Sequence, residues 1–391
     1  MSSIVIQGDT SGSITVEAPS VAGTHTLTLP KATGNIATDA TVGLGMKNRV
    51  INGNMVIDQR NAGASVSTTP TDAIYTLDRW MAAFSTANRY TVQQNAGSVT
   101  PPTGFTNYLG VTSLAATSVG SSDYYFLQQI IEGFNVADLA WGTANAKTIT
   151  LSFWVRSSLT GTFGGALTNG GQNRSYPFSY TISSANTWEQ KTITIAGDTS
   201  GTWLTNNGAG IRLRIDLGVG STFSGTAGSW AGANYFSATG ATSVVGTSGA
   251  TFYITGVQLE VGENATPFEN RMYGTELALC QRYYQQISGN SFGGSALYAI
   301  FGNGFAFNTT QADIFVPLKV TMRATPTITR SADAIQVLST NYSVTGVADV
   351  GSTFNMMFLR ISTAGTFTAG YGALWSAYNN ASAYAAFSAE L

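Results

Sequence analysis

The sequence predicts an all-β protein. Of its 391 residues, 43% are apolar and 10% are charged, which is too apolar for a disordered chain or a linker. Short runs of Val, Ile, Phe and Tyr are separated by Gly, Ser, Thr, Ala and Asn, a pattern typical of short strands joined by tight turns. At about 100 to 200 residues per domain, this length favours two or three domains, each with its own core.

Residues 1–46 have the pattern of an N-terminal β arm. Apolar residues alternate with polar ones at 14–16 and again at 25–29, on either side of a turn at 19–23. This arrangement predicts a β-hairpin. Since a two-stranded hairpin is marginally stable in water, we expect the arm to need a partner surface.

Residues 47–270 carry the clearest strand patterns. Ile, Leu and Val alternate with polar residues or Gly from 211 to 219, and residues 149–155 repeat the alternation. These strands should belong to a sandwich, with one buried face and one solvated face. In residues 252–261 the apolar residues change parity at Gly256, which predicts a β-bulge there.

A short linking helix is expected within residues 271–285. Thr275 is a suitable N-cap, Glu276 interacts favourably with the helix dipole, and Leu277, Cys280 and Tyr284 follow at helical spacing. Residues 286–391 return to strand-like runs separated by Gly-rich turns. They predict a small C-terminal β-sandwich.

Seven short segments, taken in order, resemble segments of the tail-fibre proteins of tailed bacteriophages. The two most informative are NRVINGNMVIDQRN at 48–61 and ITGVQLEVG at 254–262. The others are GSITVEAPSVAGTHTLTLP at 12–30, TPFENR at 266–271, ELALCQRYY at 276–284, MRATPT at 322–327 and FSAEL at 387–391. Their order carries the resemblance, because chance matches would not follow the family's sequence along the chain.

The resemblance implies a virion protein of the phage tail, made in the host cytoplasm and assembled as a homotrimer. Residues 1–46 would be the arm that binds tail or baseplate proteins, and residues 286–391 the distal tip that binds the receptor. The implied function is multivalent, non-catalytic attachment to a glycan on the host surface. One alternative is a purely architectural virion protein. A second is a glycan-depolymerising tailspike, although the repeat of about 20 to 30 residues typical of its β-helix is not found.

The central segments also resemble those of jelly-roll carbohydrate-binding modules of the galactose-binding-like type. In that family the first and last segments often share a calcium site. Asn52, Gly53 and Asn54 match the opening, but Gln258 stands where an acidic residue is expected, with Glu260 two residues later. Because calcium prefers several charged oxygens, we expect no metal.

Residues for catalysis are sparse. A glycosidase needs two carboxyl groups about 5 to 10 Å apart. Candidates lie at Asp72, Asp78, Asp123, Glu132 and Asp138, where surface or turn roles are the simpler interpretation. His25 and Cys280 are the only residues of their types, so a Cys-His nucleophile is not expected. No nucleotide-binding motif occurs. We therefore expect a protein without cofactors that is not an enzyme.

The charge pattern argues against two classes of partner. The formal net charge is -2 and there is no basic run, so nucleic-acid binding is not expected. No stretch of 18 apolar residues occurs, and the first residues do not have the pattern of a signal peptide. We expect a soluble protein that does not insert into membranes.

Aromatic residues in loops rich in Gly, Ser and Asn are the candidate glycan contacts, because sugars stack on flat rings and bond to nearby amides. Three groups qualify: Trp203 with Asn206 and Asn207; Trp230 with Asn234 and Tyr235; and Tyr371, Trp375 and Tyr378 with Asn379 and Asn380. The third group is the strongest candidate. For each, the alternative is that the rings pack on their own sandwich or between subunits.

Overall fold

The computed structural model describes residues 3–7, 13–17, 46–68, 73–288, 299–331, 333–377, 380 and 382–391. The chain divides into two compact units, Met1–Gly43 and Leu44–Leu391. The described part is built of strands with a single α-helix, which confirms the all-β prediction. That helix and the short 3₁₀ turns of the described ranges are too short or too polar to cross a membrane.

The arm contains one antiparallel pair, β1 (Ser3–Gln7) and β2 (Ser13–Glu17). Strand β2 is therefore paired with the segment before it. The predicted hairpin of 14–16 with 25–29 stays a prediction, because residues 25–29, including His25, lie outside the described residues.

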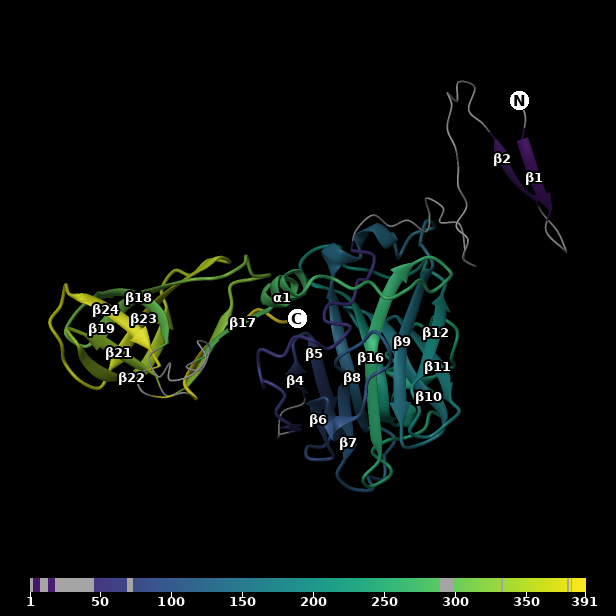
Figure 1. Cartoon of the computed structure of the whole chain (residues 1–391), viewed down its shortest axis with the longest axis horizontal. Coiled ribbons are helices and arrows are strands. Elements are labelled where there is room, and N and C mark those ends of the chain that lie inside the picture. The colour runs from purple at the N-terminus through teal and green to yellow at the C-terminus, as the bar shows by residue number, and fades with distance from the viewer. Residues whose placement is uncertain are drawn as a thin grey trace. The chain divides into compact units, whose positions relative to one another are not determined.

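The central part is a sandwich of two six-stranded sheets (Figure 1). The first has the order β11–β10–β13–β8–β5–β4, with bounds β4 (Ala73–Leu77), β5 (Trp80–Phe84), β8 (Tyr124–Glu132), β10 (Gly161–Asn169), β11 (Ser175–Ile182) and β13 (Ala209–Val219). The second has the order β12–β9–β16–β7–β6–β3, with bounds β3 (Val66–Ser67), β6 (Tyr90–Gln94), β7 (Leu109–Ser113), β9 (Ile149–Ser157), β12 (Glu189–Ile195) and β16 (Thr251–Val261). Four 3₁₀ turns connect them: η1 (Ala96–Ser98), η2 (Gly133–Asn135), η3 (Ala137–Leu139) and η4 (Ser221–Phe223).

The apolar sides of the predicted strands form the core between these sheets. Ile211, Leu213, Ile215 and Leu217 on β13 are fully buried and share one hydrophobic cluster with the apolar residues of 149–155 on β9. The predicted bulge is also present. The pairing of β16 with β9 shifts between Thr255 and Gln258, and Gly256 has a φ of 61°, which a glycine adopts without steric cost.

The second face of β13 is not solvated, contrary to the prediction. Arg214 and Asp216 are each 2% exposed, because the short strand β15 (Ser237–Ala238), which pairs with β14 (Ser224–Gly225), packs on this face and the hydroxyl of Ser237 donates to Asp216. The Arg214 guanidinium lies over the ring of Phe236. Burial raises the pKa of Asp216 to about 7 and lowers that of Arg214 to about 9.

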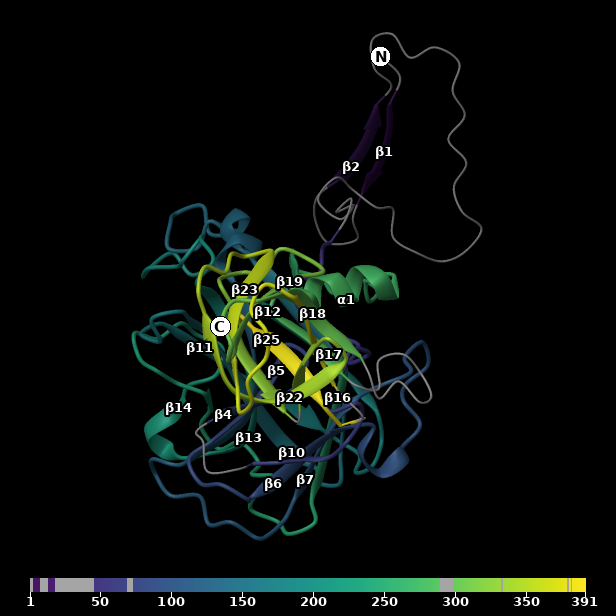
Figure 2. The ribbon, with the colours of Figure 1, turned by 90° about the vertical axis from the view of Figure 1, so that its left-hand side faces the viewer.

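Helix α1 (Tyr273–Gln281) leads into strand β17 (Tyr284–Ser288) (Figure 2). Its N-cap is Met272, so the helix begins before the predicted cap, Thr275. Glu276 is buried and its carboxylate accepts a hydrogen bond from the backbone N–H of Asn52. The helix thus begins earlier than predicted, and its first turn is bonded to the opening segment of the sandwich at Asn52.

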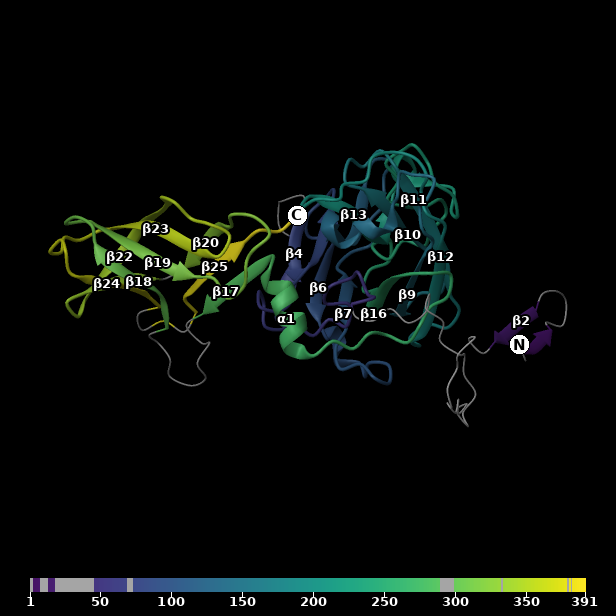
Figure 3. The same cartoon turned by 90° about the horizontal axis from the view of Figure 1, so that it is seen from above.

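The C-terminal part begins with a three-stranded sheet of order β17–β25–β20 (Figure 3), with β20 at Thr327–Ser331 and β25 at Tyr384–Ser388. Six further strands close into a barrel of order β18–β19–β23–β22–β21–β24. Their bounds are β18 (Ile300–Ala306), β19 (Gln311–Pro317), β21 (Ala334–Val337), β22 (Thr340–Asp349), β23 (Met356–Thr363) and β24 (Gly372–Ser376).

The C-terminal strands were expected to form a small β-sandwich. Six of them close into a barrel, and that closure depends on features that periodicity does not reveal. At Gly304 an added Cβ would lie 1.8 Å from the carbonyl oxygen of Asp313, so β18 and β19 approach at a distance that glycine permits. The pairing of β18 with β24 also shifts between Ile300 and Gly302. Such bulges and glycine positions allow a sheet to curve until its edges meet.

Candidate functional site

Three tryptophans from different loops form one cluster on the central sandwich. The ring centroids of Trp141, Trp203 and Trp230 are 4.7 to 5.5 Å apart, and each pair meets edge to face. The sequence pointed to Trp203 and Trp230 separately. It missed Trp141, although Asn145 follows it at the same spacing as Asn234 follows Trp230; Trp141 is 7% exposed.

The polar atoms of this tryptophan cluster are already engaged. The indole N–H of Trp141 donates to the carbonyl oxygen of Lys147 at 2.8 Å, that of Trp203 to Ser200 at 3.1 Å, and that of Trp230 to Ala196 at 2.8 Å. A ligand could therefore meet these rings through their apolar faces alone.

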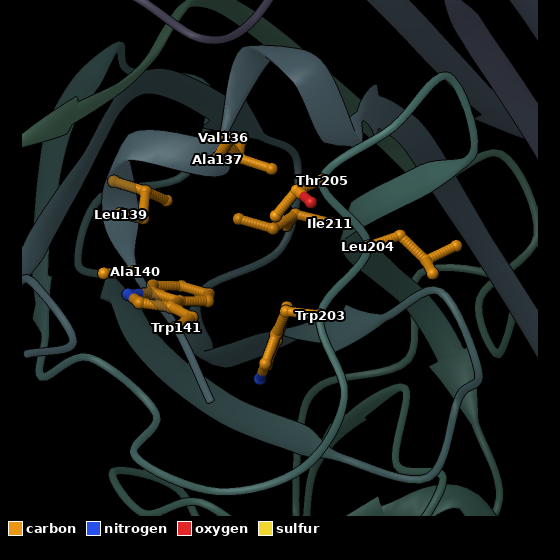
Figure 4. Close-up of a pocket in the computed structure, with 9 residues that line it drawn as sticks. All are labelled: Val136, Ala137, Leu139, Ala140, Trp141, Trp203, Leu204, Thr205 and Ile211. Atoms are coloured by element: carbon orange, nitrogen blue, oxygen red, sulfur yellow. The ribbon is translucent and has the colours of Figure 1, made fainter. Parts of the chain in front are cut away.

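The cavity beside the cluster is small. Figure 4 shows Trp141 and Trp203 at its lower edge and Val136 at its upper edge. Its volume is about 20 Å³, enough for about one water molecule and too small for a sugar ring. This geometry favours packing as the role of these tryptophans.

The amides expected near these rings do not join them. Asn207 exchanges two hydrogen bonds with Arg323, and the side chain of Asn206 accepts one from the N–H of Gly208. The ring of Tyr235 packs over Gly225, where an added Cβ would lie 2.3 Å from it. The second predicted group is therefore split: Trp230 belongs to the tryptophan cluster, whereas Tyr235 packs on β14.

Trp375, the central residue of the third group, lies in the barrel core. It is fully buried, packs edge to face on Phe301 at 5.3 Å, and donates its indole N–H to the carboxylate of Asp333. No face of this ring is open to a sugar, so the expected glycan contact at Trp375 is wrong. Tyr371 is 46% exposed, whereas Tyr378 and Asn379 lie outside the described residues.

The candidate carboxylates have individual structural partners. Asp78 is fully buried and accepts hydrogen bonds from the backbone N–H and the side-chain amide of Gln59, at 2.6 and 2.8 Å; burial raises its pKa to about 6. Asp72 lies outside the described residues. The others have separate partners: Glu132 with Arg282 and Tyr283, Asp138 with Arg49, and Asp123 with Ser85 and Gly120.

The opening and closing segments of the sandwich meet through amide side chains. Asn48 accepts hydrogen bonds from the N–H groups of Val50 and Leu259 and donates to the carbonyl oxygen of Val257. Gln258 donates to Glu260 at 2.8 Å and accepts from the backbone N–H of Glu269. Within the described ranges, no group of three His, Cys, Asp or Glu side chains is placed to hold a metal ion.

Most of the resemblance segments converge in space. We call the contacts that residues 48–61, 266–284, 322–327 and 387–391 make with one another and with Arg79 and Glu132 the junction. At its centre, the Glu390 carboxylate pairs with Arg60, at 2.8 Å, and with Arg79, which is 1% exposed. The guanidinium carbons of these arginines lie 3.5 Å from the Tyr284 ring centroid and 3.6 Å from that of Tyr283, respectively.

Further hydrogen bonds complete the junction. Arg323 donates to the carbonyl oxygens of Ala389 and Glu390, at 2.7 and 2.8 Å. Arg282 makes a bidentate pair with Glu132, at 2.6 and 2.9 Å, and the hydroxyl of Tyr283 donates to the same carboxylate. The segments of the junction therefore build a largely buried polar connection between the sandwich and the strands that lead to the barrel.

Comparisons with known proteins give weak similarities. No protein-family model and no curated protein matches the chain. Similar solved structures include the enzymatically active domain of tailspike protein 4 of bacteriophage CBA120, with 11% identity over 55% of this chain and 22% of that chain and a TM-score of 0.33. They also include a family 11 carbohydrate-binding module of Clostridium thermocellum in complex with a β-1,3-1,4-mixed-linked tetrasaccharide, with 13% identity over 51% of this chain and 98% of that chain and a TM-score of 0.26. This chain thus covers less than a quarter of the tailspike domain, and these TM-scores are too low to support an inference about fold or ligand.

Proposed function

We propose that this chain is a tail-fibre protein of a tailed bacteriophage that binds a host-surface glycan without cleaving it. The observation that carries the proposal is the junction. Segments far apart in sequence, each selected for its resemblance to tail fibres, contact one another. Arg60 pairs with Glu390, and Arg323 donates its side chain to Ala389 and Glu390 and its backbone N–H to the carbonyl oxygen of Arg282. Chance matches have no reason to meet in space, so their contact supports treating the resemblance as that of one three-dimensional unit.

The proposed mechanism is multivalent attachment. The arm contributes a two-stranded sheet, which is marginal by itself and gains stability from other copies of the arm or from a tail protein. A homotrimer presents three identical binding surfaces. Linking modest single-site affinities in this way raises the overall affinity by a factor of about 10² to 10⁴.

The carboxylates support binding rather than hydrolysis. A glycosidase holds two carboxyl groups at a cleft where substrate enters. Asp78 and Glu132 are buried and held by hydrogen bonds to Gln59, Arg282 and Tyr283, so neither reaches solvent. The exposed Asp138 forms an ion pair with Arg49.

The full-length protein provides the test. Light scattering should give three chains per particle, and the trimer should bind at least one member of an immobilised panel of bacterial surface polysaccharides without releasing reducing ends. A trimer that binds no polysaccharide would indicate an architectural protein. Release of reducing ends would indicate a depolymerase, and a stable monomer with a protease-resistant arm would contradict the proposed assembly.

A further inference from the structure

Three connections meet at one end of the barrel. Strand β18 ends at Ala306 and β19 begins at Gln311; β21 ends at Val337 and β22 begins at Thr340; β23 ends at Thr363 and β24 begins at Gly372. Because neighbouring strands of this barrel are antiparallel, these three loops lie at the same end. We call residues 307–310, 338–339 and 364–371 the three-loop end. The connections to β20 and β25 leave from the opposite end.

A hollow of about 370 Å³ is present at the three-loop end. All three loops contribute to it, and its lining includes Thr309, Leu338, Thr340, Thr366 and Thr368. Its volume lies within the range of about 300 to 1,000 Å³ usual for small-molecule sites. The cavity beside the tryptophan cluster, at about 20 Å³, is far smaller.

The chemistry of this hollow suits a neutral, hydroxyl-rich ligand. Among the described residues that line it none is charged, and four are exposed threonines. In the part of the chain that the structure describes, the hydroxyls of Thr309, Thr340, Thr366 and Thr368 have no hydrogen-bond partner, so each can donate to and accept from a ligand. The guanidinium of Arg360 lies over the ring of Phe307 at this end of the barrel but is paired with Asp313, so it offers an anionic glycan no unpaired counter-charge.

An aromatic pair adds an apolar surface. Tyr342 and Phe367 line the hollow with ring centroids 5.1 Å apart. The C–H face of a sugar packs on such rings while its hydroxyls bond to nearby polar groups. Tyr371, the exposed residue of the third predicted group, belongs to the same end of the barrel, because its carbonyl oxygen accepts from the N–H of Ala306.

The turn between β21 and β22 has an unfavourable sequence for its shape. Leu338 and Ser339 have φ of 48° and 64°, and the two-residue turn that needs such values strongly favours Asn-Gly. A non-glycine residue in this region costs about 1 kcal/mol or more. The Leu338 side chain is also 62% exposed, so burial does not offset that cost within the chain. An exposed leucine in a strained turn is available to pack on a ligand.

We infer that the three-loop end of the barrel is the glycan contact surface and that its ligand is a neutral oligosaccharide. This inference rests on the proposed glycan-binding function and adds to it the location and the chemical class. The inferred glycan site is thus formed by these three loops and not by Trp375. The threonine hydroxyls would bond to sugar hydroxyls while Leu338 and Tyr342 pack on the sugar's apolar face.

The test uses the full-length protein and immobilised neutral polysaccharides as probes: β-1,4-galactan, mixed-linked β-glucan, xylan and neutral bacterial surface polysaccharides. The double variant Thr340→Val and Thr366→Val removes two hydroxyls with little change in shape, and should weaken binding by about tenfold or more. The matched control is Thr329→Val, an exposed threonine on β20, which should leave binding unchanged.

A second variant separates binding from stability. Leu338→Asn with Ser339→Gly gives the turn its preferred sequence, so the melting temperature should rise while binding weakens by about tenfold. If the melting temperature and the glycan affinity both fell, the loss of binding would be due to misfolding, and the inference would be overturned. Raising NaCl from roughly 0.05 to 0.5 M should change the affinity by less than about twofold, and a steep salt dependence would contradict a neutral ligand.

The two proposals fail in different ways. Wild-type binding that survives in both barrel variants would overturn the three-loop end as the site and leave glycan attachment standing. A wild-type protein that binds no polysaccharide of any charge would overturn glycan attachment, and this inference with it.

Discussion

The junction and the three-loop end of the barrel are built from opposite kinds of residues. The junction buries arginine–carboxylate pairs, such as Arg79 with Glu390, and contains most of the segments that resemble tail fibres. The three-loop end exposes threonine hydroxyls, has no charged residue in its hollow and contains none of those segments. A buried ion pair tolerates few substitutions, because loss of one partner costs about 3 to 5 kcal/mol. An exposed threonine tolerates many, since surface changes stay within about 0.5 kcal/mol. The residues that carry the resemblance are therefore architectural, and the proposed contact surface has no sequence signature.

The largest expected effect is on the junction. Glu390→Ala leaves the buried Arg79 without its carboxylate and should lower the free energy of unfolding by about 3 to 5 kcal/mol, as measured by denaturant titration. The matched control is Asp138→Asn, which removes the carboxylate of the exposed pair with Arg49 and should cost about 1 kcal/mol or less. Equal effects from the two variants would remove the distinction between junction and surface.

The next effect separates the barrel core from the barrel surface. Trp375→Phe removes the indole N–H that bonds to the buried Asp333 carboxylate and should cost about 1 to 3 kcal/mol of stability, without a specific loss of glycan affinity. Tyr371→Phe, at the exposed three-loop end, should change stability by less than about 0.5 kcal/mol. Normal stability with abolished binding in the Trp375 variant would return that residue to the site.

The third effect is on the pH dependence of stability. Burial raises the pKa of Asp216 from 3.8 to about 7, so the folded state holds this proton more tightly than the unfolded state. The resulting stability is fully present below about pH 4 and is lost as pH rises through about 7. The wild-type melting temperature should therefore fall between pH 5 and pH 8, and Asp216→Asn should reduce that fall by a few degrees, on the order of 1 kcal/mol.

The same titration also tests the barrel. Asp78, whose pKa burial raises to about 6, remains in the Asp216 variant, so part of the fall should persist. No group that titrates between pH 5 and pH 8 lines the three-loop end, so glycan affinity should stay constant over this range. An affinity that follows the melting temperature would place the ligand nearer the central sandwich.

The smallest effect is a gain in stability. Leu338→Asn places a residue that tolerates positive φ at the strained turn and should raise the free energy of unfolding by about 0.5 to 1 kcal/mol. Thermal unfolding of the full-length protein measures it. Destabilisation would show that the exposed leucine packs within the assembly, and the three-loop end would then be a subunit contact.

Local patterns in the sequence were sufficient for the strands and the helix. The alternation at 211–217 and 149–155 identified the residues that fill the sandwich core, and the parity change at Gly256 located the bulge in β16. These predictions hold because each depends on the two-residue period of a strand, which the chain carries wherever it packs. The helix was placed within the correct range, but it begins at Tyr273 rather than after Thr275, and its Glu276 accepts a long-range hydrogen bond from Asn52 that local patterns do not reveal.

Tertiary structure decided what covers each face and which ring is accessible. Arg214 and Asp216 have the spacing of a solvated face, yet β15 and Phe236 bury them. Ala373 and Trp375 alternate with Leu374 and Ser376 as an inward-facing pair would, but only the closure of the barrel makes that side an interior. Periodicity determines which residues share a side of a strand, whereas the neighbouring segments that remove water from that side are fixed by pairing across long stretches of chain. The sequence by itself therefore determined an all-β chain and its strand faces, and the tertiary structure alone assembled the junction, the tryptophan cluster and the three-loop end.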